Sequence, residues 1–92
     1  MEEAGIANVG SSTSQVKQIK VTFPEPFSAA PIVVANALQT DPKYPPGSIK
    51  DTFAVTITSV STSGFTANVC RVDSEATSWG QNLSLGYTAA TP

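Results

Sequence analysis

Short runs that alternate apolar with polar residues constrain this chain most, because Gly, Pro, Ser or Asp residues interrupt them throughout its length. Alternation places the apolar side chains on one face of an extended strand, whereas few stretches show the 3.6-residue period of a helix. In the clearest run, residues 15–23, Ile19, Val21 and Phe23 share one face. The pattern therefore predicts an all-β chain.

Six strands are predicted, at residues 5–9, 15–23, 32–38, 52–60, 65–72 and 82–89. The apolar sequence of residues 32–38 indicates burial on both faces, and Gly64 is expected to take a positive φ in a hairpin turn. Turn signals every ten or so residues favour a six-stranded antiparallel β-sandwich. Residues 1–14 are expected to form an N-terminal strand and a flexible link, and residues 15–92 the remainder of a single domain.

Size and charge limit the possible partners. A chain of 92 residues buries a thin core, so self-association is expected. Only 13% of residues are charged, the net charge is −2, and no basic run is present, which argues against nucleic-acid binding. No apolar stretch approaches the ~20 residues that a membrane span requires, so no membrane insertion is expected.

Catalytic and metal-binding residue types are scarce. The chain has no histidine, and its single cysteine, Cys70, has no neighbouring base that would make it a nucleophile. Cys70 is expected to be a small buried hydrophobe. The missing ligands exclude a zinc site. The candidates for calcium form no recognised loop; they are Asp41, Asp51, Asp73 and Glu75. We therefore expect no enzyme activity, no cofactor and no metal ion.

Four residues are candidates for ligand binding. Trp79 lies in a polar segment, residues 73–81, where its ring could stack on a sugar while Asp73 accepts hydrogen bonds from hydroxyls. Arg71 could contribute if the strand end turns it outward, and Tyr44 in a proline-rich segment is a weaker candidate. The alternative is that Trp79 packs over the core or in a subunit interface.

Several segments together resemble one family. They are Val21-Thr22-Phe23-Pro24-Glu25-Pro26-Phe27, Pro31-Ile32-Val33-Val34, Phe53-Ala54-Val55, the hairpin Ser59-Val60-Ser61-Thr62-Ser63-Gly64-Phe65, and Leu83-Ser84-Leu85-Gly86-Tyr87-Thr88-Ala89. In order and spacing they resemble the H-type lectin domain of snail agglutinins and slime-mould discoidins, which occurs in related form at the ends of phage tail proteins. The resemblance covers roughly residues 15–89.

The resemblance implies a β-sandwich that assembles as a homotrimer and, in the lectins, binds galactose-type sugars near subunit boundaries. This chain has Thr52 where those lectins have an arginine, and Val72-Asp73 where they have a Trp-His pair. Two functions follow as alternatives. One is a multivalent glycan- or cell-surface-recognition module, outside the cell or on a virion, for example at the tip of a phage or tailocin fibre. The other is a structural trimerisation or capping domain without its own ligand.

Overall fold

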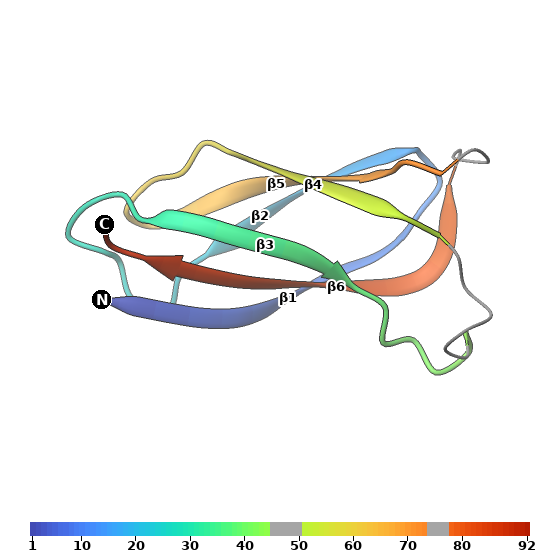
Figure 1. Cartoon of the computed structure of the whole chain (residues 1–92), viewed down its shortest axis with the longest axis horizontal. Helices are drawn as coiled ribbons and strands as arrows, with labels where there is room; N and C mark the ends of the chain where they lie inside the picture. The colour runs from blue at the N-terminus through green and yellow to red at the C-terminus, as the bar shows by residue number, and fades with distance from the viewer. Residues whose placement is uncertain (45–50, 74–77) are drawn as a thin grey trace.

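The computed structural model describes residues 1–44, 51–73 and 78–92. Its regular elements are six β-strands, with no helix among the described residues. They are β1 (Glu2–Ser12), β2 (Val16–Thr22), β3 (Ile32–Leu38), β4 (Phe53–Thr58), β5 (Gly64–Arg71) and β6 (Trp79–Ala90). Figure 1 shows them as two layers, with the N- and C-termini together at one end.

Each layer is a three-stranded antiparallel sheet. One has the order β1-β6-β3 and the other β2-β5-β4, so each central strand pairs on both sides. The predicted all-β class and six-stranded sandwich are confirmed. The first and last strands are longer than predicted: β1 takes in part of the expected link, and β6 begins at Trp79.

Aromatic rings dominate one end of the core between the sheets. Phe23 contacts Phe27 edge-to-face at 5.0 Å between ring centroids, and Phe65 contacts Tyr87 in the same manner at 5.2 Å. A tilted contact between Phe23 and Phe65 joins the two pairs. All four side chains are buried. Phe27 reaches this cluster because the prolines before it end the β2 ladder and redirect the chain.

The requirement for Gly64 has a different cause from the one predicted. Among the described residues, positive φ values occur at Ser59 and Gly10, not at Gly64. A Cβ atom on Gly64 would instead lie 2.1 Å from the carbonyl oxygen of Val21. Glycine is therefore required because the β2 backbone approaches β5 too closely for any side chain.

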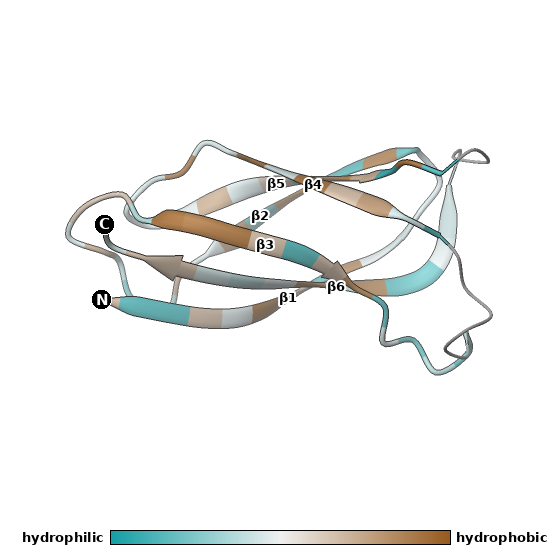
Figure 2. Ribbon diagram, in the orientation of Figure 1, coloured by the Kyte–Doolittle hydropathy of each residue, from teal (hydrophilic) through white to brown (hydrophobic). Residues whose placement is uncertain are grey.

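The prediction that residues 32–38 are buried on both faces is wrong. Ile32 and Val34 are 61% and 62% exposed, while Val33 and Ala35 face the core. The strand alternates like the others, but apolar residues occupy both of its faces. Figure 2 shows the resulting hydrophobic colouring at the start of β3.

The outer faces of the two sheets differ in chemistry. On the β1-β6-β3 sheet, Ile6 is 74% exposed and shares the face with Ile32 and Val34. On the β2-β5-β4 sheet the outward positions are mainly hydroxyl, amide and ammonium groups, as in the aligned residues Gln18, Asn68 and Thr56. One face is thus suited to further burial and the other to water or a polar ligand.

Candidate functional site

Arg71 organises the end of the sandwich that lies away from the termini. It occupies the last position of β5, and the alternation of that strand points it inward, in line with the buried residues Ala67 and Val69. Its Nε donates to Asp73 Oδ2 at 2.9 Å, and its Nη2 donates to Asp51 Oδ1 at 3.0 Å. The guanidinium therefore bridges two carboxylates, one just before β4 and one just after β5.

Neighbouring groups fix both carboxylates in place. The second oxygen of Asp51 accepts a 2.6 Å hydrogen bond from the side-chain amide of Gln81, which is 1% exposed. Asp73 Oδ2 also accepts from the backbone N–H of Thr52 at 3.2 Å. Arg71 additionally donates to the carbonyl oxygen of Ser78. Such pairing is what allows charged groups to remain at the end of an apolar core.

The structure places the Trp79 ring inside the sandwich. Trp79 is 3% exposed and packs edge-to-face on Phe53, with ring centroids 5.1 Å apart. Its indole N–H donates to the carbonyl oxygen of Gly10 at 2.8 Å. The ring thus joins β6 to β4 and β1, which matches the packing alternative. A ligand would reach the indole only after a rearrangement.

Tyr44 lies on the other side of β6. A Cβ atom on Gly80 would be 2.6 Å from the Tyr44 hydroxyl, so the phenol lies directly over this outward position. The tyrosine is half-buried, and none of the hydrogen bonds in the described part of the chain involves its hydroxyl. Its ring therefore lies on the outer side of β6 and is only partly covered by the residues that the structure describes.

Asp41 holds the Tyr44 segment against β6. Its Oδ2 accepts from the backbone N–H of Asn82 at 2.9 Å, and its Oδ1 accepts from the N–H of Lys43. These two backbone hydrogen bonds, Asn82 first, favour the charged carboxylate and lower the pKa of Asp41. The backbone N–H of Tyr44 in turn donates to the carbonyl oxygen of Asp41, which fixes the start of the tyrosine's turn.

The four predicted site residues are thus only partly brought together. Arg71 and Asp73 form a direct ion pair, Trp79 is buried beside them, and Tyr44 lies across β6. Sequence reasoning missed that Asp51 binds Arg71 and that the Gln81 amide binds Asp51. The available signal for Gln81 was its place in the inward alternation of the last strand, two residues before Leu83.

The acidic residues weighed for calcium do not converge in the described part of the chain. No group of three or more His, Cys, Asp or Glu side chains is placed to hold a metal ion there. Asp51 and Asp73 meet on a guanidinium, and Glu75 lies outside the described residues. Cys70 is half-buried, and its thiol donates to the carbonyl oxygen of Arg71. No helix among the described residues could cross a membrane.

Comparison with known proteins places this geometry in a family. The family model for the H-type lectin domain matches residues 18–89. The R1-type pyocin tail fibre has a similar fold, with a TM-score of 0.73 and 22% identity over 96% of this chain and 67% of that one. The tailspike of Pseudomonas phage phi297 has a TM-score of 0.69 and 18% identity, covering 100% of this chain and 15% of the tailspike. No curated protein sequence matches the chain. Because the family model matches more than half of its length, the chain belongs to the H-type lectin domain family.

Proposed function

We propose that this domain recognises glycans or cell-surface polysaccharide as a homotrimer, at the tip of an extracellular or virion-surface fibre. Binding without catalysis is the proposed activity. The observation that carries the proposal is the ordered polar end of an H-type lectin domain, where Arg71, Asp51 and Asp73 are fixed in one network. The fold likeness to a pyocin tail fibre and a phage tailspike supports the fibre setting.

The position of this network suits recognition. Figure 1 shows the two termini at the opposite end of the long axis, so a neighbouring domain attached there would leave the network accessible. Carboxylates held by a guanidinium cost little further ordering when a sugar hydroxyl binds, and Tyr44 supplies an accessible ring nearby. If each site binds weakly, three sites in one trimer would raise the overall avidity.

We expect Tyr44→Ala to weaken glycan binding by about tenfold or more, since a stacked aromatic is worth about 1–3 kcal/mol in other stacking sites. Tyr44→Phe keeps the ring and should retain most of the affinity. The measurement is a glycan array on the domain, followed by a binding isotherm for the best ligand. Equal affinities for the wild type and Tyr44→Ala would contradict a ligand-contact role for this ring.

The trimer part of the proposal rests on the outer face of the β1-β6-β3 sheet. Exposed Ile6, Ile32 and Val34 form an apolar surface there, and the small residue Gly86 of the central strand lies between β1 and β3. The register places one acidic side chain, Glu2, at the edge of this face near the termini. Burying the apolar surface between copies would remove it from water and supplement the thin core.

We expect the wild-type domain to have three times its 9.5 kDa chain mass in light scattering, and Val34→Glu to reduce this to a monomer. A charge buried without a partner in the interface would be strongly destabilising. Thr56→Glu is the matched control, because Thr56 is exposed on the outer face of the other sheet. A Val34→Glu protein with unchanged mass would place the interface elsewhere, and a monomeric wild type would remove the trimer.

A structural trimerisation or capping role is the second candidate. It is favoured by the burial of Trp79 and by the internal hydrogen bonds of the Arg71 network, since both features serve the fold itself. The glycan array discriminates between the candidates. A trimer that binds no glycan would favour the capping role.

A further inference from the structure

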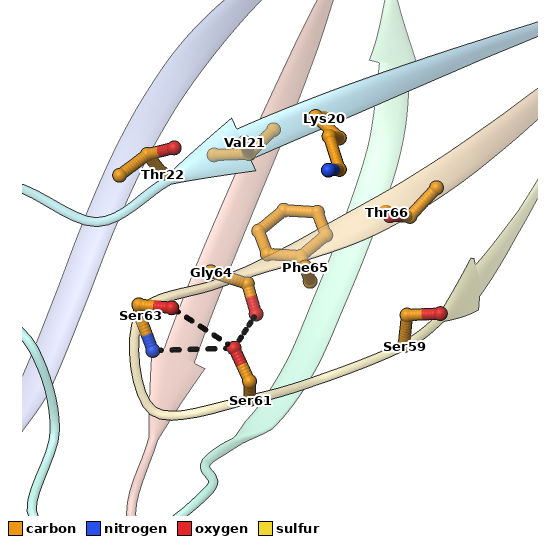
Figure 3. Close-up of a pocket in the computed structure, with 9 residues that line it drawn as sticks. All are labelled: Lys20, Val21, Thr22, Ser59, Ser61, Ser63, Gly64, Phe65 and Thr66. Carbon is orange, nitrogen blue, oxygen red and sulfur yellow. Dashed lines mark hydrogen bonds between the residues drawn. The ribbon is translucent and has the colours of Figure 1, made fainter.

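A hollow lies at the opposite end of the molecule from the Arg71 network. It has a volume of about 300 Å³ and is formed where the β4–β5 hairpin meets the end of β2. Figure 3 shows Lys20, Thr66, Ser59, Ser61 and Ser63 arranged around it. This volume is at the lower limit of the range for small-molecule sites. The hollow opens on the polar outer face of the β2-β5-β4 sheet.

The backbone fixes the groups around this hollow. Lys20 on β2 pairs with Thr66 on β5, and Thr66 pairs in turn with Thr58 on β4. Ser59 follows directly with a φ of 53°, a conformation that residues other than glycine rarely adopt. On the hairpin, the Ser61 hydroxyl accepts from the Ser63 N–H and lies 3.2 Å from the Ser63 hydroxyl. The backbone positions from which these side chains extend are therefore fixed, and Ser61 and Ser63 are also held by side-chain contacts.

Lys20 supplies a positive charge that no partner within the described part of the chain neutralises. Lys17 donates to the carbonyl oxygen of Ser11, and Arg71 binds two carboxylates, but no hydrogen bond or ion pair involves the Lys20 ammonium. Within the described residues, no hydrogen bond involves the side-chain hydroxyl of Ser59 or that of Thr66, a residue that is 8% exposed. None of the described residues that line the hollow is acidic.

We infer that this hollow binds the carboxylate of an acidic sugar residue, with Lys20 as its counter-ion and the hydroxyls of Ser59 and Thr66 as hydrogen-bonding partners. An ammonium and a carboxylate form a charge-assisted hydrogen bond, which is stronger than one between neutral groups. The serine hydroxyls of the hairpin both donate and accept, as sugar hydroxyls do. The site is separate from the Arg71 end, so it extends the proposed function to acidic polysaccharides without depending on that end.

The test is a titration of the isotopically labelled domain at low salt, followed by NMR. The probes are galacturonate, neutral galactose and acetate. We expect galacturonate to shift the amide signals of Lys20, Ser59 and Thr66, with an affinity that falls as salt is added. We expect Lys20→Gln to weaken this binding by about tenfold or more, because a hydrogen bond to a charged group is lost.

Lys43→Gln is the matched control, since it removes the same charge from an exposed loop position and should leave galacturonate binding unchanged. Three results would overturn the inference: equal binding of galactose and galacturonate, acetate binding as tight as that of galacturonate, or unchanged affinity in Lys20→Gln. The signals that shift separate this site from the first, because a ligand at the Arg71 end would perturb Arg71 and Tyr44 instead. If no ligand binds at one of the two sites, binding at the other can therefore still be tested.

Discussion

Replacing Phe65 with alanine should lower the free energy of unfolding by about 3–5 kcal/mol, the usual cost of removing a large aromatic from a core. Phe65 is 3% exposed, and its ring contacts those of Phe23 and Tyr87. Its strand, β5, is paired on both sides, with β2 and with β4, which limits how far the backbone can move inward to fill the gap. The cavity left by the substitution should therefore persist. Because small domains have only about 5–15 kcal/mol of stability, this loss is a large part of the whole.

Denaturant unfolding at a fixed protein concentration measures this loss, since assembly would make the midpoint concentration-dependent. Val16→Ala provides the control, because Val16 is half exposed on the outer face of β2 and its substitution should change stability by no more than about 0.5 kcal/mol. An unchanged midpoint in Phe65→Ala would show that the ring does not pack between the sheets.

The strands and the inward positions could be read from the sequence because their signal is local. Alternation with a period of two assigns Val21, Phe65 and Leu83 to the core without knowledge of their neighbours, and all three are buried. The same rule fails for Ile32 and Val34. Both residues are apolar yet face away from the core, so a rule that equates apolar with core assigns them wrongly.

Three-dimensional contacts determine the features that sequence reasoning missed. Gly64 is required because a carbonyl of another strand approaches it, and no turn signal near residue 64 reports that contact. Asp51 and Asp73 are 22 residues apart and meet only because Arg71 lies between them. Of the four predicted site residues, Arg71 and Asp73 could be placed near each other from their spacing. The position of Tyr44 depends on how Asp41 binds β6.

Replacing Trp79 with alanine should also lower the free energy of unfolding by about 3–5 kcal/mol. The indole is 3% exposed, packs on Phe53 and donates to the carbonyl oxygen of Gly10, so its loss leaves a cavity and an unpaired acceptor between three strands. Trp79→Phe separates these effects, because it keeps a ring but removes the N–H and should cost about 1–3 kcal/mol.

The measurement that decides the role of Trp79 is glycan binding and denaturation on the same preparation, at a temperature where each variant is still folded. If Trp79 is a packing residue, both variants should lose stability, and Trp79→Phe should keep its glycan affinity per folded molecule. If Trp79 instead stacks on a sugar, Trp79→Ala should lose glycan affinity while its denaturation midpoint stays unchanged. The indole's hydrogen bond to Gly10 favours the first outcome, because a ring that turned outward to meet a sugar would have to break this bond and uncover Phe53. Binding at this end would then depend on Tyr44, with Trp79 acting by holding β6 and the carbonyl of Ser78 in position for Arg71.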